Sequence, residues 1–248
     1  MMIKKNILRF SCLFILFTSY AFATVVKIGA YEFPPFVTWV SGKPNGVLVK
    51  LSKHLNETQK KYSFELIETS SNRRYDDMKN KYYDIIFFEN IQWGWLKYPV
   101  QASKVFLVGG EVFITKILDN KNQTYFNDLK NKTIRGILGY HYGFANFLTD
   151  PLTLKKWNIE LTNSHEGNIV AVLEGRSDLA IVTKEYLDIY LKKNSEAKKN
   201  LLVSNKMDQM YHHTVLIREG SPISVSEING LLDNIKKDQS LKNILDYK

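Results

Sequence analysis

Polar and aromatic residues follow an apolar stretch without any spacer in the segment DIIFFENIQWGWLKYPV, residues 84–100. Residues 85–88 have the composition of a buried strand. After them come an acid, two amides and two tryptophans: Glu89, Asn90, Gln92, Trp93 and Trp95. Because Trp combines a large apolar surface with one N–H donor, it suits the edge of a ligand cleft. Alternatively, the tryptophans cover the edge of a domain, and Glu89 pairs with Arg73 or Arg74.

Histidine is the residue type most often found in metal sites, but its spacing here does not favour one. His212 and His213 are adjacent, so on a strand they would point to opposite faces. Together with His141 they do not form a convincing ligand set. We therefore predict that the protein binds no metal.

Nucleophilic catalysis is also disfavoured. The sequence contains no G-x-S-x-G motif, and its one cysteine, Cys12, lies near the N-terminus. Glu89, Glu166 and His165 would form an acid/base set in a closed cleft, which keeps an enzyme as an alternative. We predict a protein without catalytic residues or cofactor.

The first 23 residues have the three parts of a secretory signal peptide. Basic residues come first, then a short apolar run over 11–20, and then the small-x-small sequence Ala21-Phe22-Ala23. The run is too short to span a bilayer well, although an uncleaved anchor is the alternative. We predict cleavage after Ala23 and a periplasmic location. The mature chain then has no cysteine, so its hydrophobic core alone must stabilise it.

The net charge does not indicate a nucleic-acid-binding protein. The predicted signal contains Lys4, Lys5 and Arg9, so its removal leaves 31 basic and 25 acidic residues, a formal net charge of +6. Many lysines lie at the expected surfaces and ends of helices, for example Lys236 and Lys237. In an exported protein this distribution indicates solvated faces.

Two α/β units follow the signal. The first has the β-α-β-α-β order of a mostly parallel sheet flanked by helices. Its predicted elements are strand 25–30, a helix capped by Asn45, strand 64–69, helix 72–81 and strand 84–88. The second unit repeats this pattern: strand 133–138, helix 141–147, strand 159–162, a helix capped by Asn163 and ended by Gly175, strand 178–182 and helix 185–193.

Two extended segments, 108–117 and 211–217, are predicted to join these units. The last apolar helix, around Ile228 and Ile235, is expected to return to the first unit. The chain would then cross twice between two lobes, which makes a hinge and a cleft. We predict that lobe 1 comprises residues 24–111 and 216–248, and that lobe 2 comprises residues 112–215.

The order of several motifs resembles a known family. These motifs are an aromatic-Pro-Pro-Phe turn at 33–36, YYDIIFFE, FNDLKNKTIRGILGYHYG, LEGRSDLAIVTKEYLDIYL and YHHTVLIREGSP. Over residues 25–245 they resemble the periplasmic solute-binding proteins of the polar amino acid uptake type, extracellular solute-binding family 3. The resemblance implies a two-lobed periplasmic binding protein type II fold, in which each lobe is a mostly parallel sheet flanked by helices.

The chain departs from this family at the ligand clamps. The resemblance implies an arginine after the third strand, which would hold the carboxylate of an amino acid. Residues 89–96 contain none. It also implies an aspartate where this chain has Thr183. Both clamps for a free amino acid are therefore missing.

The family geometry places five loops at the cleft, at residues 31–36, 70–74, 89–95, 139–143 and 163–166. Their side chains are rich in aromatic rings, and Glu32 and Glu89 add negative charge. Such a pocket suits a cation or a ring. Loop 139–143 offers backbone N–H groups to an anion, or is an ordinary turn. The predicted ligand-binding residues are Tyr31, Phe33, Glu89, Asn90, Gln92, Trp93, Tyr140, Tyr142, His165 and Thr183.

The sequence therefore predicts a monomeric periplasmic solute-binding protein. It would capture a small polar, cationic or aromatic solute in an inter-lobe cleft for an ABC-type uptake system. The expected partners are the solute and an inner-membrane permease or receptor, and no nucleic acid is expected. The alternatives are an exported enzyme resembling cyclohexadienyl dehydratases and a stand-alone ligand sensor of the same fold.

Overall fold

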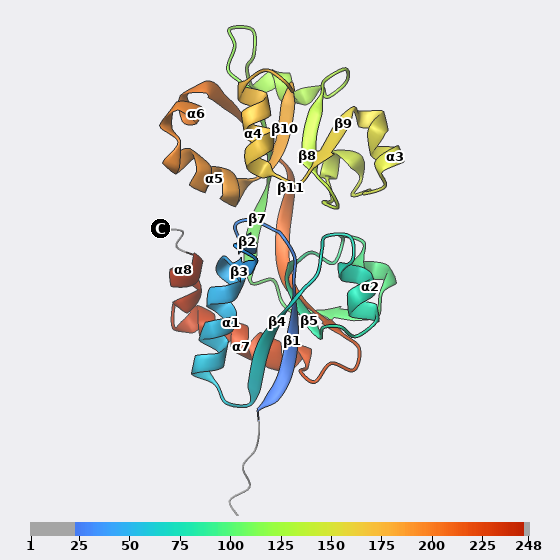
Figure 1. Cartoon of the computed structure of the whole chain (residues 1–248), viewed down its shortest axis with the longest axis vertical. Coiled ribbons are helices and arrows are strands. Elements are labelled where there is room, and N and C mark those ends of the chain that lie inside the picture. The colour runs from blue at the N-terminus through green and yellow to red at the C-terminus, as the bar shows by residue number, and fades with distance from the viewer. Residues whose placement is uncertain (1–22, 246–248) are drawn as a thin grey trace, which may run out of the picture.

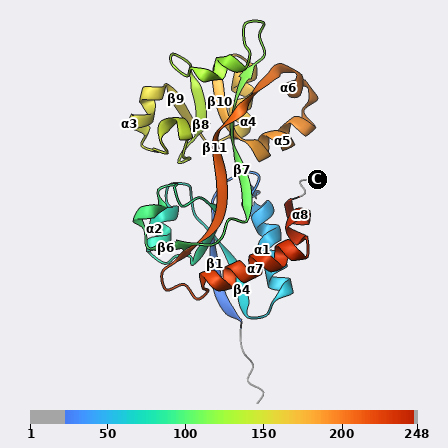
Figure 2. The same ribbon diagram turned by 180° about the vertical axis from the view of Figure 1, so that it is seen from behind.

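Two lobes joined by two long strands make up the protein (Figure 1). The computed structural model describes residues 23–245, so the predicted signal peptide lies outside the described residues apart from Ala23. The joining strands are β7 (Leu107–Lys116) and β11 (Leu201–Arg218), which pair antiparallel from one lobe to the other. Figure 2 shows both strands crossing between the lobes. The predicted two-lobed α/β fold is confirmed.

Lobe 1 is built on a sheet with a parallel centre. Strand β1 lies between β4 and β5, parallel to both, and β11 pairs antiparallel with β5 and β6. Helices α1, α7 and α8 lie together on one side of the lobe and α2 on the other (Figure 2). The elements are β1 (Thr24–Ala30), β2 (Thr38–Val40), β3 (Lys43–Asn45), α1 (Val47–Thr58), β4 (Tyr62–Glu68), α2 (Arg74–Lys79), β5 (Ile85–Glu89), η1 (Trp95–Lys97), β6 (Val100–Ala102), α7 (Val225–Lys237) and α8 (Ser240–Leu245).

Lobe 2 repeats this arrangement around the other ends of the crossing strands. Strand β10 pairs antiparallel with β7 and parallel with β8, and β8 pairs parallel with β9. The elements are η2 (Gln123–Asn127), β8 (Ile134–Ile137), η3 (Gly143–Ala145), α3 (Pro151–Leu154), η4 (Lys155–Trp157), β9 (Ile159–Thr162), α4 (His165–Leu173), β10 (Leu179–Thr183), α5 (Lys184–Lys193) and α6 (Ser195–Asn200).

Apolar side chains at strand and helix spacing form the cores of both lobes. In lobe 1 the buried face of α1 includes Leu48, Leu51 and Leu55, as the sequence pattern predicts. In lobe 2, Ile169 and Val172 of α4 pack in a core cluster with strand residues of β7 and β10. Each of these buried aliphatic side chains stabilises the fold by roughly 1.5–3 kcal/mol.

Helix α4 begins one residue later than predicted. Ser164, not Asn163, is the N-cap, and its hydroxyl oxygen accepts a hydrogen bond from the backbone N–H of Gly167 at 3.0 Å. At the other end the prediction for Gly175 is confirmed. Gly175 has a φ of 74°, and its N–H donates to Val172 while that of Arg176 donates to Ala171, the pattern of a Schellman motif.

Two other local predictions are wrong. Asn45 ends β3, and the N-cap of α1 is Gly46, with a φ of 100°. A Cβ atom at Gly46 would lie 2.8 Å from the carbonyl oxygen of Phe36, so the close approach requires glycine. Segment 141–147 is only a short 3-10 turn, since Asn146 and Phe147 both adopt positive φ and end it.

Among residues 23–245, every helix is too short or too polar to span a lipid bilayer. Within the same range, no group of three or more His, Cys, Asp or Glu side chains is arranged to hold a metal ion.

Candidate functional site

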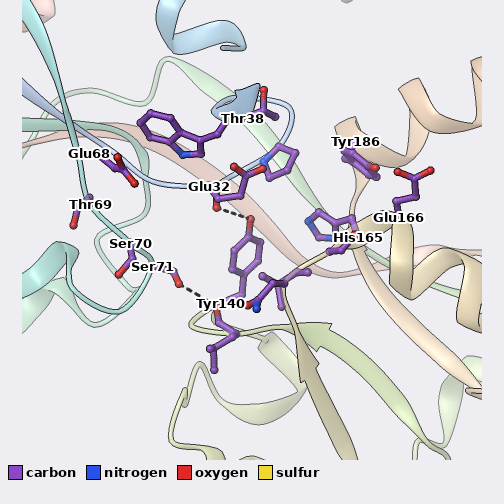
Figure 3. A pocket seen from close by; sticks show the side chains of 16 residues that line it. Glu32, Thr38, Glu68, Thr69, Ser70, Ser71, Tyr140, His165, Glu166 and Tyr186 are labelled. Carbon is purple, nitrogen blue, oxygen red and sulfur yellow. Dashed lines mark hydrogen bonds between the residues drawn. The ribbon is translucent and has the colours of Figure 1, made fainter. Parts of the chain in front are cut away.

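Two hollows lie between the lobes, and Tyr140 lines both. The larger one, here called the outer cleft, has a volume of about 510 Å³ (Figure 3). The smaller one, the inner cavity, has a volume of about 10 Å³, which is space for about one water molecule. The sequence predicts a cleft at this place but not its division into two hollows.

Loops at the carboxyl ends of strands line the outer cleft, which is where open α/β sheets bind ligands. Lobe 1 contributes residues after β1, the β2 strand, and the end of β4 with the residues after it: Glu32, Pro34, Thr38, Trp39, Glu68, Thr69, Ser70 and Ser71. Lobe 2 contributes the end of β8 with the loop after it, the start of α4, and one residue of α5: Ile137, Leu138, Tyr140, Asn163, Ser164, His165, Glu166 and Tyr186.

The outer cleft is acidic. Three carboxylates line it, Glu32, Glu68 and Glu166, and no Lys or Arg belongs to its lining among the described residues. Burial, together with the negative charge of Glu166 and Glu32, raises the pKa of Tyr186 to about 12. Carboxylates of both lobes therefore act on the same side chain.

His165 is a neutral polar group in this cleft. Its side chain is 3% exposed, and burial lowers its pKa to about 3. Its Nε2 atom lies 3.2 Å from the Thr183 hydroxyl oxygen, while its Nδ1 atom has no hydrogen-bond partner within residues 23–245. A buried polar atom of this kind needs a partner, and a bound solute would provide one.

Aromatic rings form most of the lining of the inner cavity. Phe33 contacts Tyr140 edge-on at 5.4 Å between ring centroids, and Trp93 contacts Tyr211 edge-on at 4.9 Å. Tyr31 stacks on Phe33 at 5.8 Å. Because these distances are typical of aromatic pairs in cores, the rings stabilise one another across the inter-lobe boundary.

A polar network on the crossing strands adjoins these rings. The Gln209 side-chain amide donates to Glu111 Oε2 at 2.8 Å and to the His141 carbonyl oxygen, and its own oxygen accepts from Trp93 Nε1 at 3.0 Å. One side chain of β11 therefore links the loop after β5, strand β7 and the loop after β8. Burial raises the pKa of Glu111 to about 8, although hydrogen bonds from Tyr211 and Gln209 act in the opposite direction and lower it.

Glu89 is bound inside lobe 1. Arg74 Nε lies 2.9 Å from Glu89 Oε1, and Trp95 Nε1 donates to Glu89 Oε2 at 2.7 Å. The carboxylate reaches this place because Phe88 has a φ of 60° near a register shift between β5 and β11, so that Phe88 and Glu89 are both buried. The alternative interpretation, in which Glu89 pairs with Arg74, matches this geometry.

Two backbone donors that follow β8 are also bound internally. The N–H groups of Gly143 and Phe144 donate to the two carboxylate oxygens of Asp208, at 2.6 and 2.8 Å. Asp208 belongs to β11. The anion that these N–H groups bind is therefore part of the chain itself.

The ten residues predicted to bind ligand fall into two groups. Tyr31, Phe33, Trp93 and Tyr140 line the inner cavity, and Tyr140 and His165 line the outer cleft. The remaining five line neither hollow: Glu89, Asn90, Gln92, Tyr142 and Thr183.

Each of these five side chains lies outside the two hollows. Glu89 pairs with Arg74, and the Thr183 hydroxyl contacts His165. Gln92 is exposed, and its backbone N–H donates to the Asn90 side chain at 3.0 Å. Tyr142 is fully buried, with its hydroxyl bound to the backbone of β8.

Sequence reasoning missed several residues of the two hollows or the network beside them, among them Trp39, Glu68, Glu111, Tyr186 and Gln209. A signal existed for Trp39, since Ser41-Gly42 between two short polar-apolar runs is a two-residue hairpin turn, and both residues have positive φ. A signal also existed for Glu111, a lone acid in an otherwise apolar extended segment. Tyr186 and Gln209 carry no comparable local signal.

The fold is shared with solved binding proteins. The putative binding component of an ABC transporter from Wolinella succinogenes DSM 1740, complexed with lysine, is 17% identical over 89% of this chain and 93% of that chain, with a TM-score of 0.71. The GluR0 ligand-binding core with L-glutamate is 16% identical over 90% and 97%, with a TM-score of 0.68. A histidine kinase sensor domain with similarity to periplasmic binding proteins is 14% identical over 90% and 94%, with a TM-score of 0.65.

These identities are low, and no family model and no curated protein matches the chain. The structural likeness therefore establishes the fold. The ligand has to be argued from the side chains of this protein.

Proposed function

We propose that this protein is a periplasmic solute-binding protein of extracellular solute-binding family 3, which captures a small polar, cationic or aromatic solute for an ABC-type uptake system. The observation that supports this most directly is the outer cleft of about 510 Å³, lined by loops from both lobes. A solute that contacts both lobes stabilises the closed form by its differential affinity for that form. The closed form is what a membrane permease would recognise.

The crossing strands are the natural hinge for this motion. The proposed lobe boundaries, 111/112 and 215/216, fall within β7 and β11. Hinges are usually a few residues that absorb backbone changes, and these strands connect the lobes directly. We propose that the protein works as a monomer, without cofactor or catalytic residues, after export by the signal peptide.

A sensor role is the second candidate, because a histidine kinase sensor domain shares this fold over 90% of the chain. Deletion of the gene would separate the two roles. Loss of solute uptake supports transport, whereas loss of a transcriptional response with uptake intact supports sensing.

The experiment that tests solute binding is native mass spectrometry of the freshly purified protein. We expect a mass excess from a small co-purified molecule, which disappears when the protein is denatured and refolded. If the refolded protein binds nothing from an extract of the cells that made it, the proposal is wrong.

A further inference from the structure

We propose that the solute is an organic dication without a carboxylate group, held in the outer cleft by Glu32 and Glu68 of lobe 1 and Glu166 of lobe 2. This inference rests on the proposed function, since it names the chemical class that the cleft takes. A diamine or a longer polyamine is the simplest molecule of this class.

The arrangement of charge is the first argument. Carboxylates from both lobes line one cleft, and the described part of the chain places no Lys or Arg side chain in its lining. Bringing like charges together in a partly desolvated gap costs electrostatic energy. A solute with positive charge toward each lobe reverses this cost, so that its binding is coupled to closure.

The second argument is that two kinds of group suited to a carboxylate, a guanidinium and a pair of backbone N–H groups, are already bound within the protein. Arg74 faces the inner cavity, but its guanidinium is paired with Glu89. The backbone N–H groups of Gly143 and Phe144 are bound by Asp208. A solute carboxylate in the outer cleft would meet the three glutamates instead, which disfavours an amino acid.

The neutral groups of the cleft also suit such a solute. His165 lies between Tyr140 and Tyr186, at 5.8 and 5.2 Å between ring centroids (Figure 3). In the tautomer that donates from Nε2 to Thr183, its unpartnered Nδ1 atom accepts a hydrogen bond from an ammonium group. The tyrosine rings offer apolar surface to methylene groups and a favourable face to a cation.

Isothermal titration calorimetry of the mature protein with a matched pair of probes tests this inference. The probes are 1,5-diaminopentane and L-lysine, which differ only by the carboxylate group. We expect 1,5-diaminopentane to bind at least tenfold more tightly than lysine, and more tightly than the monoamine 1-aminopentane.

Variants of the cleft acids extend the test. Glu32→Gln and Glu166→Gln should each weaken the binding of 1,5-diaminopentane about tenfold or more. Glu174→Gln is the matched control, because Glu174 ends α4 outside the cleft and pairs on the surface with Arg176. The Glu174→Gln variant should bind 1,5-diaminopentane with the same affinity as the wild-type protein.

Several outcomes would overturn the inference. One is lysine binding as tightly as the diamine. Another is no heat from 1,5-diaminopentane or spermidine at concentrations up to about 1 mM. A co-purified solute that is anionic or zwitterionic would overturn this inference and leave the proposed function intact, whereas a refolded protein that binds nothing from the cell extract would overturn both.

Discussion

The Arg74–Glu89 pair shows how single residues determine the chemistry of this site. The side chains are 1% and 0% exposed. Removing two charges from water is costly, and their attraction offsets this only with further favourable contacts. These contacts are present, since Trp95 donates to the carboxylate and the rings of Tyr31 and Tyr75 lie 4.9 and 4.4 Å from the guanidinium carbon. Glu89 therefore occupies the anion-binding position beside Arg74, a guanidinium that would otherwise be free to bind an anion in the inner cavity.

Breaking this pair should be far more harmful than replacing it. Arg74→Met leaves the Glu89 carboxylate buried without its partner, so we expect the free energy of unfolding to fall by about 3–5 kcal/mol. The double variant Arg74→Met, Glu89→Leu should recover a large part of this loss. Urea denaturation of the single and double variants measures the coupling, and strictly additive effects would show that the two charges do not depend on each other.

The raised pKa of Glu111 predicts a specific pH dependence of the free energy of unfolding. Its pKa is raised to about 8 in the folded protein, so between pH 4.5 and 8 the folded form holds a proton that the unfolded chain releases. Stability should therefore fall as pH rises through this range, by up to about 1.4 kcal/mol per pH unit, and then level off. Some neighbouring groups shift the pKa of Glu111, and others have their own pKa shifted by its charge. These groups are Tyr140, Tyr142, Glu185, Asp208, Gln209 and Tyr211.

Thermal unfolding of Glu111→Gln beside the wild-type protein checks this. The melting temperature of the wild-type protein should decline relative to that of the variant between pH 5 and pH 9. Parallel curves would mean that Glu111 titrates normally.

At the scale of elements, most strands and helices can be predicted from the sequence. Apolar runs and 3.6-residue periodicity predict β1, β5, β9, α1 and α5 to within a few residues. Strand β11 begins at Leu201, ten residues before the predicted start at 211, because polar residues at two register shifts interrupt its apolar pattern. Asn163 and Ser164 are adjacent and both are favoured N-cap residues, so the sequence does not show which of them caps α4. The local backbone geometry decides this.

The start of α7 offers a test of how local chemistry stabilises an element. Ser224 and Glu227 form a capping box, and Glu227 also accepts from the Tyr62 hydroxyl at 2.6 Å. Ser224→Ala should lower the free energy of unfolding by about 1 kcal/mol. Ser226→Ala, at an exposed position in the same helix, should leave it nearly unchanged. Chemical denaturation distinguishes the two, and equal effects would exclude a capping role for Ser224.

At the scale of the whole molecule, the loops of the cleft are predictable and the division into two hollows is not. Parallel strands place their carboxyl ends at one edge, so the five loops follow from the pattern of elements and the family resemblance. Which side chains line the cleft depends on how the lobes pack against each other. Trp93, for example, is held by Gln209, which lies 116 residues further along the chain.

Gly139 is a point where the lobes approach closely. It has a φ of 78°, and a Cβ atom there would lie 2.5 Å from Ser71 Oγ and 2.6 Å from Asn72 Oδ1. We therefore expect Gly139→Ala to hold the lobes apart and to weaken solute binding by tenfold or more. Gly175→Ala is the matched control, since Gly175 has a φ of 74° and no atom within 4 Å of the added Cβ.

Small-angle X-ray scattering with 1,5-diaminopentane would compare both variants. Gly139→Ala should keep a larger radius of gyration, whereas Gly175→Ala should lose stability but close normally. Equal closure of the two variants would show that this contact does not limit the motion.

The central claim, that two hinged lobes close around a solute, is tested most directly by the distance between them. The predicted mature chain has no cysteine, so Lys53→Cys on α1 and Glu196→Cys on α6 can be spin-labelled selectively. Both side chains are well exposed, at 76% and 78%. Double electron–electron resonance should give a broad distance distribution for the solute-free protein. Addition of 1,5-diaminopentane, or of the solute released from the purified protein, should make it shorter and narrower. A single distribution that neither addition changes would contradict the account.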